Sequence, residues 1–554
     1  MLYDGRATTV KLTGLVPGTA YELRLYTRSW DGLASTTERT VLYAFYPSAD
    51  AAPAARFAFD KNHNLPTVII FRYVAATPEL TIASTALSVT SNPWSGFYGL
   101  THELLAVADL PAGAATLVLE NKSAAAFTVA AAVADNGRPT SLLRTGSGPL
   151  TLSGAVSLTG STTLDGALTL APPDGVVQTF GPVHGAGGLV KSDAGSVRLQ
   201  SANVYAGPTL VQAGTLYVSD SAALGSVADG TAVAPGAALA LADAGVNTLT
   251  IKEPVTFAGT GPDGLGALRN DSVAQQQTAF QRLTLSGDAT IGGTAATPLI
   301  PFENGKGSFN LRNGTLDLAG HTLTKAGPGA FLLSYSRLLN AAPGAAVDVA
   351  GGALGLDYTA DLGGSSAQTL TVRTGANLDL YRVYVPQSWT LALEDGAHFS
   401  ARSSTSLAEN VWEGPVSLLG GQALLGGGGS GAIAGPVSGP GGLVKSRGTT
   451  YLLNPENTYA GTTTVTNGVL YAAAAGSLPD PSPAKLNVRQ NGTLVVRYAD
   501  DTATWPLAWG AADVDVIATT AIFTQSSAAL GFDPYYADAT YDGDLSGFGL
   551  SKYG

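Results

Sequence analysis

One twelve-residue segment occurs twice in this chain and limits what the chain can fold into. The sequence GPVHGAGGLVKS begins at Gly181, and GPVSGPGGLVKS begins at Gly435, 254 positions later, with ten of the twelve residues identical. Each copy places a proline and four glycines around one short apolar run that ends in lysine. Glycine and proline punctuate turns, and Leu-Val is typical of a strand, so each copy predicts turn, short strand and turn.

The similarity continues past the lysine in the same register. Each lysine is followed twelve residues later by an asparagine, and then by a tyrosine and a glycine at equal spacing. We therefore predict a repeat in which these residues have a structural role: Lys191, Asn203, Tyr205 and Gly207 in one copy, and Lys445, Asn457, Tyr459 and Gly461 in the other. Partial copies place Lys325, Arg144 and Lys552 at the lysine position. We expect the lysine stem to cover a corner, with the ammonium capping carbonyls or exposed to water.

A shorter pattern fills the sequence between the copies. Segments such as GALTLAP, NGTLDLAG and GANLDLYR each combine Gly or Asn with an apolar-polar-apolar strand. Short strands separated by Gly or Asn corners are typical of a parallel β-helix, in which stacked coils bury one another's inner face. The fold class predicted is all-β: an N-terminal antiparallel β-sandwich (1–135), a junction (136–147) and a right-handed parallel β-helix, or β-solenoid (148–554).

The repeat closely resembles the autotransporter-associated β-strand repeat, also called the passenger-associated transport repeat. The resemblance implies a parallel β-helix at the outer surface of, or secreted by, a Gram-negative-type bacterium, and it implies no single activity. The N-terminal segments LTGLVPGTAYELRLYTRSWDG and WSGFYGLTHELL are similar to a fibronectin- or galactose-binding-like sandwich. We expect the chain to be a piece of a longer secreted protein, whose signal peptide lies outside it. The alternative is that a neighbouring subunit completes the half-repeat at Lys552, which would give head-to-tail contacts between copies.

Composition excludes several classes of function. The chain has no cysteine, which removes disulfides and thiolate metal ligands, and its net charge of −12 without a basic stripe argues against nucleic acid. No apolar run reaches the length of a transmembrane segment.

Three sets of residues are candidates for chemistry or binding. Asp538, Asp542 and Asp544 would suit calcium, or form an acidic solvated turn. The alternating Asp513 and Asp515 are best explained as outward-facing strand carboxylates. Aromatic residues of the first domain could form a sugar-stacking platform, or belong to its core: Trp30, Trp94 and Tyr98, with Phe97 beside them. Tyr21 is placed as a structural tyrosine corner. The five histidines share no motif.

These observations predict a secreted, non-enzymatic, elongated structural protein that assembles with itself into a filament, stalk or surface layer. The alternative is an adhesin or carbohydrate-binding surface protein, whose partners are glycans or cell surfaces and whose binding module is the sandwich. A polysaccharide lyase or hydrolase is disfavoured, because no acid-base pair is evident. No cofactor is expected apart from calcium.

Overall fold

A computed structural model describes most of the chain. The described residues are 7–17, 20–27, 41–46, 53–59, 67–86, 99–104, 115–135, 139–242, 244–294, 308–339, 344–363, 368–386, 388–402, 409–499, 508–518, 522–525, 527–534, 540–543, 545 and 549–552. The fold is all-β, as predicted. The chain divides into two compact units, one of Met1–Ala244 with Ile251–Thr256, the other of Gly245–Thr250 with Phe257–Gly554.

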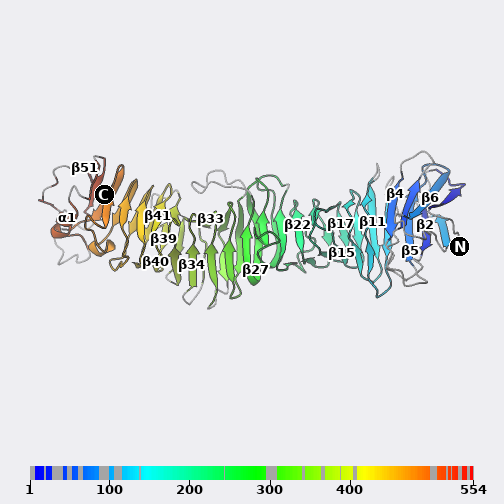
Figure 1. Ribbon diagram of the computed structural model, residues 1–554, viewed down its shortest axis with the longest axis horizontal. Coiled ribbons are helices and arrows are strands. Elements are labelled where there is room, and N and C mark those ends of the chain that lie inside the picture. Colours follow the sequence, from blue (N-terminus) through cyan, green and yellow to red (C-terminus); the bar gives the residue numbers. More distant parts are fainter. Residues whose placement is uncertain are drawn as a thin grey trace. The chain divides into compact units, whose positions relative to one another are not determined.

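The first unit begins with antiparallel strands (Figure 1). One antiparallel sheet has the order β1 (Ala7–Thr13), β6 (Glu79–Ala86), β3 (Val41–Tyr46) and β4 (Ala55–Phe59). A second sheet begins with β7 (Gly99–Leu104), β2 (Ala20–Thr27), β5 (Thr67–Val74) and β8 (Ala115–Glu120). The rings of Phe45 on β3 and Phe71 on β5 stack with centroids 4.3 Å apart. The predicted N-terminal antiparallel sheet is therefore confirmed, whereas its assignment as a fibronectin- or galactose-binding-like sandwich stays a prediction.

Strand β8 joins the antiparallel and parallel parts of this second sheet. It pairs antiparallel with β5, where Phe71 lies opposite Leu117, and parallel with β11 (Thr140–Thr145), where Leu142 lies opposite Leu117. The parallel order continues through β14 (Thr162–Leu164), β17 (Val183–Gly185) and β20 (Val204–Tyr205). Parallel pairing thus already includes β8, and the predicted domain limits at 135 and 148 stay a prediction.

The parallel coils of the first unit have two further ladders of strands, and the inner face of the ladder through β12, β15 and β18 is leucine-rich. Leu150, Leu168 and Leu189 lie opposite one another on successive coils, and all are buried. Such stacking of like side chains is how coils that cannot bury their own inner face become stable together. The strands are β9 (Phe127–Val129), β10 (Val133–Ala134), β12 (Leu150–Leu152), β13 (Val156–Ser157), β15 (Leu168–Leu170), β16 (Val177–Phe180), β18 (Leu189–Lys191), β19 (Ser196–Leu199), β21 (Thr209–Val211), β22 (Gly214–Val218), β23 (Thr231–Val233) and β24 (Ala237–Leu241). Strand β25 (Ile251–Gly259) contributes residues to both units.

The second unit is also built from parallel strands, which pair from coil to coil in three ladders. Two of these ladders contain β26 (Leu268–Asn270), β27 (Gln276–Gly292), β28 (Phe309–Asp317), β29 (Thr322–Lys325), β30 (Ala330–Ser334), β31 (Arg337–Leu339), β32 (Ala346–Val349), β33 (Ala353–Asp357), β34 (Gln368–Val372), β35 (Asn377–Tyr381), β37 (Trp389–Leu393), β38 (His398–Ala401), β40 (Val416–Leu418), β41 (Gln422–Gly426), β43 (Val437–Ser438), β44 (Gly442–Lys445), β46 (Thr463–Val465) and β48 (Leu486–Val488). The other contains β36 (Val383–Val385), β39 (Asn410–Trp412), β42 (Ser430–Ile433), β45 (Thr449–Leu452), β47 (Gly468–Ala472), β49 (Gly492–Arg497), β50 (Ala529–Asp533) and β51 (Gly549–Lys552).

Helix is rare in the described ranges. The α-helix α1 spans Ala511–Ile517 and buries Val514 and Ile517, and a 3₁₀ turn spans Ala475–Ser477. No helix of the described ranges has the length and apolar character needed to cross a membrane.

Candidate functional site

The recurring lysine lies inside the coil, in a position that neighbouring coils fill with hydrocarbon. Lys191 pairs with Leu170 on the preceding coil and with Val211 on the next. Its side chain is almost completely buried, with 1% exposed. The lysine stem therefore continues the apolar column of the solenoid interior.

The buried ammonium of Lys191 is bound by backbone carbonyls of the corner. Its Nζ donates to the carbonyls of Ser192, Asp193 and Ala213 at 2.8, 2.7 and 2.9 Å. Three N–H donors thus meet three acceptors, which is the full capacity of an ammonium group. Burial lowers the pKa of Lys191 to about 8, and the charge of Asp193 opposes this effect.

Lys325 and Lys445 repeat this arrangement in the second unit. The Nζ of Lys325 donates to the carbonyls of Ala326, Gly327 and Gly351 at 2.7, 3.1 and 3.1 Å. The Nζ of Lys445 donates to the carbonyls of Leu425 and Arg447. Burial lowers the pKa of each lysine to about 7, because no carboxylate compensates for the lost water.

Arg144 places a guanidinium at a similar corner of the first unit. It is 2% exposed and donates to the carbonyls of Gly146 and Gly148. Lys552 lies on β51, but its side chain is outside the described residues. Each of the three described lysines therefore binds carbonyls of its own corner and one carbonyl of a neighbouring coil, that of Ala213, Gly351 or Leu425.

The repeat asparagine connects three successive coils. The Oδ1 of Asn203 accepts from the backbone N–H of Val183 at 2.8 Å, and its Nδ2 donates to the carbonyl of Ala223. Asn457 makes the same two bonds, with Val437 and Ser477, at 2.8 and 2.9 Å. All four partners lie twenty residues before or after the asparagine. The amide therefore links one coil to the coil before it and the coil after it.

The repeat tyrosine is buried beside a threonine hydroxyl. The distance between the hydroxyl oxygens of Tyr205 and Thr209 is 2.5 Å, and that between Tyr459 and Thr463 is 2.6 Å. Burial raises the pKa of Tyr459 to about 12. Both phenols therefore remain neutral and act as hydrogen-bonding groups within the core.

The glycines of the repeat allow adjacent coils to approach at the backbone. A Cβ on Gly207 would lie 2.7 Å from the N of Gly188, and one on Gly188 would lie 2.4 Å from the carbonyl oxygen of Pro208. Gly185 and Gly439 adopt φ angles of 106° and 108°, a region that favours glycine. Close contact and backbone conformation therefore explain the glycine-rich segment that occurs twice.

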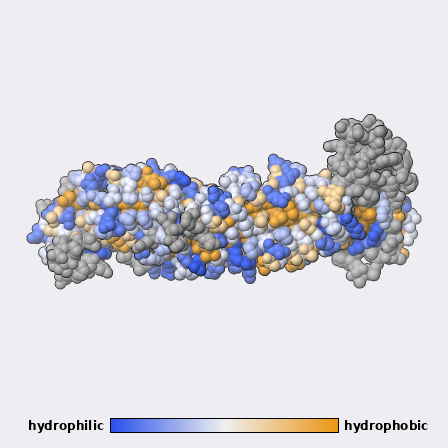
Figure 2. Space-filling view, turned by 90° about the horizontal axis from the view of Figure 1, so that it is seen from below, coloured by the Kyte–Doolittle hydropathy of each residue, from blue (hydrophilic) through white to orange (hydrophobic). Residues whose placement is uncertain are grey.

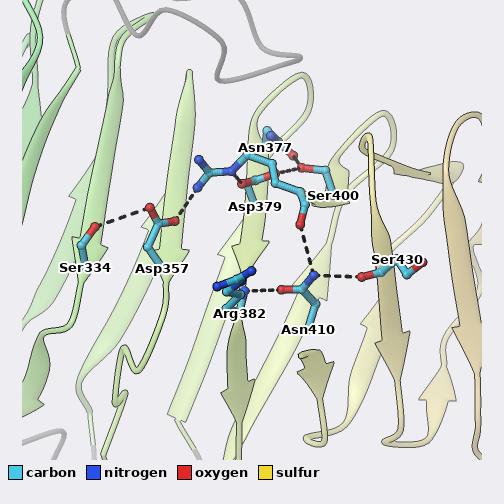
Figure 3. Close-up of polar contacts among 9 residues, drawn as sticks. Ser334, Asp357, Asn377, Asp379, Arg382, Ser400, Asn410 and Ser430 are labelled. Atoms are coloured by element: carbon cyan, nitrogen blue, oxygen red, sulfur yellow. Dashed lines mark hydrogen bonds and ion pairs between the residues drawn. The ribbon is translucent and has the colours of Figure 1, made fainter. Parts of the chain in front are cut away.

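A buried network of charged and polar groups in the second unit is the strongest candidate for chemistry (Figure 3). Arg402 forms ion pairs with both Asp357 at the end of β33 and Asp379 on β35. Ser400 donates to the carboxylate of Asp379 at 2.6 Å. The Oγ of Ser334 donates to the carboxylate Oδ2 of Asp357 at 3.5 Å. Close to this network, Asn410 accepts from the backbone N–H of Arg382 at 2.6 Å and donates to the carbonyl of Ser430 at 2.9 Å.

Electrostatics indicates a structural role for this network. Asp379 and Asp357 are 2% and 6% exposed, and burial raises the pKa of Asp379 to about 6 and that of Asp357 above its usual range. Their charges raise the pKa of Arg402 despite its burial. The two carboxylates share one guanidinium and are shielded from solvent, so they have no access to a substrate as an acid-base pair would.

Two tyrosines and an arginine close to this network have an unusual backbone conformation. Tyr335, Tyr358 and Arg382 have φ angles of 50°, 58° and 53°, a conformation that is rare for bulky residues. The rings of Tyr335 and Tyr358 stack at 4.3 Å. Each ring thus has one face covered by the other, and the guanidinium of Arg312 lies 5.0 Å from the ring centroid of Tyr335.

The predicted acidic site is only partly within the described residues. Asp538 and Asp544 lie outside them, and Asp542 is exposed, so the calcium hypothesis stays a prediction. The interpretation of Asp513 and Asp515 as strand residues is wrong, because both lie on α1, where Asp513 accepts from the backbone N–H of Gly510. The described residues hold no group of three or more His, Asp or Glu side chains that could bind a metal.

The predicted aromatic platform also cannot be placed. Trp30, Trp94, Phe97 and Tyr98 all lie outside the described residues. Tyr21 is described, and its hydroxyl accepts from the backbone N–H of Val16 at 2.9 Å, the local contact expected of a structural tyrosine corner.

Sequence reasoning missed the Arg402 network. Asp357 and Asp379 follow Gly-Leu and Asn-Leu in segments that otherwise alternate apolar and small residues. The sequence feature that could have indicated this network is an aspartate at a buried position of a short strand, because a buried carboxylate needs a cation or hydrogen-bond donors beside it.

Comparison with known proteins agrees with the geometry. The family model of the passenger-associated-transport repeat matches residues 142–171, 189–218 and 447–472. These segments contain or adjoin Arg144, Lys191 and Lys445, whereas the coil of Lys325 has the same corner without a match. No curated protein and no solved structure matched the chain. The chain is therefore a parallel β-solenoid protein built with passenger-associated-transport repeats.

Proposed function

We propose that this protein is a non-enzymatic structural component of a bacterial surface that assembles laterally with copies of itself. The repeats and the solenoid fit an extracellular autotransporter passenger and indicate a secreted or surface protein. The buried lysines that bind backbone carbonyls, and the asparagines that bind the coils before and after them, hold the coils together. A scaffold whose buried polar groups serve its own stacking is suited to a mechanical role.

One observation supports lateral assembly in particular. A column on the second unit has small side chains on successive coils: Thr371 and Ser417, which are half-buried, Ser438, which is exposed, and Ala392, which is buried between Thr371 and Ser417. In the first unit, Thr128, Thr151 and Thr169 form a similar column. Figure 2 shows hydrophobic and hydrophilic residues interspersed over the drawn face. Small side chains at regular intervals allow two such faces to approach closely without large losses of side-chain entropy.

Electron microscopy and sedimentation velocity of the full chain test the proposal. We expect ordered polymers, with interfaces of more than about 1,000 Å², the lower limit for a specific contact. Thr371→Glu combined with Ser417→Glu should prevent polymer formation, since like charges would face each other across the interface. Gln277→Glu, at an exposed position on β27, is the matched control and should leave assembly intact. A wild-type chain that remains monomeric up to millimolar concentration would contradict the proposal.

A further inference from the structure

A surface groove crosses four parallel strands in the C-terminal half of the second unit. It has a volume of about 380 Å³ and is lined mainly by residues of β46, β48 and their flanks, with Gln422 of β41 and Val444 of β44. Three threonines, Thr462, Thr464 and Thr466, point from one coil into this groove.

The residues of the next coil are paired with these threonines in register. Thr464 lies opposite Asn487 on β48. Continuing this register one residue beyond each end of the ladder places Thr462 level with Lys485 and Thr466 level with Arg489. Lys485 and Arg489 are four residues apart on an extended segment. At roughly 3.3 Å per residue, their Cα atoms are about 13 Å apart. The groove therefore has a cation at each end and hydroxyl and amide groups between them.

Both cations retain donors that the protein does not use. The Nζ of Lys485 donates to the carbonyl of Ala460 at 2.6 Å, which leaves two of its three N–H groups. The Nε of Arg489 donates to Oδ1 of Asn487 at 3.1 Å, and no described carboxylate forms an ion pair with either cation. Asp480 is close by, and its pKa is lowered mainly by Ser482 and only secondarily by the charge of Lys485.

The groove differs in charge from the rest of the molecule. Its lining contains a lysine and an arginine and no carboxylate, in a chain whose net charge is −12. The lining has no aromatic side chain, which disfavours stacking of nucleic-acid bases. The hydroxyl of Thr464 makes no hydrogen bond within the described residues, and the amide of Gln422 donates to Oγ1 of Thr462 at 2.6 Å. The lysine and the arginine of this groove can attract anions, and its threonine and amide side chains can form hydrogen bonds with hydroxyl groups.

We infer that this groove binds an acidic oligosaccharide, with Lys485 and Arg489 each binding a carboxylate or sulfate group and Thr464 and Asn487 binding hydroxyls between them. Two separated cations require two separated anionic groups, so a chain of sugars fits better than a single anion. This inference goes beyond the proposed structural role and does not depend on assembly. The groove lies on the solenoid and is therefore a different site from the N-terminal aromatic residues, for which sugar binding stays a prediction.

Binding measurements on the full chain test this inference. The probes are an oligogalacturonate, a heparin-derived oligosaccharide, the monosaccharide galacturonate, inorganic sulfate and the neutral cellohexaose. We expect at least one acidic oligosaccharide to bind, with affinity that falls as salt increases, and the small anions and cellohexaose to bind at least tenfold more weakly. Equal binding of cellohexaose, or of galacturonate or sulfate, would overturn the inference, as would no binding of either acidic oligosaccharide.

Variants then locate the site. Lys485→Gln combined with Arg489→Gln should weaken acidic-oligosaccharide binding more than tenfold. The matched control, Lys122→Gln combined with Arg337→Gln, removes the same charges at positions that are 77% and 67% exposed and should bind like wild type. Thr464→Val keeps the side-chain shape and should weaken binding severalfold with an unchanged melting temperature. Equal losses in the groove and control variants would show non-specific charge attraction and overturn the assignment.

Discussion

Lys191 lies directly opposite Val211 in the parallel ladder, so an ammonium-bearing side chain occupies a position that the next coil fills with a branched hydrocarbon. The same substitution of lysine for an aliphatic residue occurs at Lys325, between Ile291 and Val349. Such a position is tolerable only because the corner supplies carbonyl acceptors within reach of the ammonium. The lysine thus completes the hydrogen bonding of a corner from inside the core.

Removing the ammonium of Lys325 should therefore destabilise the fold. Lys325→Met keeps an apolar stem but leaves three carbonyls without their donor, and we expect a loss of about 1–3 kcal/mol in the free energy of unfolding. Lys325→Ala adds a cavity and should cost about 2–5 kcal/mol. Urea denaturation measures both. Lys122→Met, at a side chain that is 77% exposed, should change stability by less than about 0.5 kcal/mol, and a similar loss there would contradict the explanation.

Glu253 should make stability depend on pH. It is 4% exposed, its Oε1 accepts from Thr231 at 2.8 Å, its Oε2 has no described partner, and burial raises its pKa to about 7. Between about pH 4.5 and 7 the folded state keeps a proton that the unfolded chain has released, so stability falls as the pH rises through this range. Glu253→Gln should remove that slope, match wild type near pH 4 and exceed it by about 3 kcal/mol at pH 8. Thermal unfolding across this range measures the difference, and the exposed Glu456→Gln should show none.

Asn457 should be essential for the cohesion of its three coils. Asn457→Ala leaves the N–H of Val437 and the carbonyl of Ser477 buried without partners, and we expect a loss of about 2–4 kcal/mol. Hydrogen exchange should show faster exchange at Val437 than in wild type. Asn467→Ala, at an exposed asparagine of the same region, is the control. Unchanged exchange at Val437 would refute the bridging role.

Gly461 tests the close approach of the coils. A Cβ there would lie 2.3 Å from backbone atoms of Gly441 and Gly442, so Gly461→Ala should destabilise by more than about 2 kcal/mol. Gly420→Ala meets no atom within 4 Å and should be nearly neutral. Melting temperatures of the two variants should separate clearly; equal values would mean that the coils have room at Gly461.

Arg402 should be needed mainly because of its two carboxylate partners. Arg402→Met leaves Asp357 and Asp379 buried without a counter-charge, and we expect a loss of about 3–5 kcal/mol at pH 7.5. The loss should shrink as the pH falls below about 6, because protonated carboxyls need no counter-charge. Adding Asp357→Asn and Asp379→Asn should restore most of the stability, and a triple variant as unstable as the single one would contradict this account.

The sequence predicted the stacked coils because their evidence is local. Lys191, Asn203 and Tyr205 recur with constant spacing, and each forms contacts within its own corner or with the coils twenty residues away. The sequence did not predict the Arg402 network, whose members come from three coils of unequal length, so no fixed spacing relates Asp357 to Arg402. The groove was missed for a related reason: alternation of Lys485, Asn487 and Arg489 becomes meaningful only when β48 is set beside β46. Asp513 and Asp515 alternate like strand residues, yet both lie on the short helix α1, where the carboxylate of Asp513 accepts from the backbone N–H of Gly510. Alternation over so few residues cannot distinguish a strand from a helix.

Strand β8 has a further consequence for how the chain acquires its shape. It is the one described strand that has an antiparallel neighbour, β5, on one side and a parallel neighbour, β11, on the other. The parallel pairing of β8 with β11 therefore sets which residues of β11 lie opposite the antiparallel part of this sheet. A slip of one residue in this pairing would turn the buried Leu142 of β11 to the outer face of the sheet, because side chains alternate along a strand. The edge that β8 presents beside β5 is therefore the edge on which the parallel strands of this sheet begin.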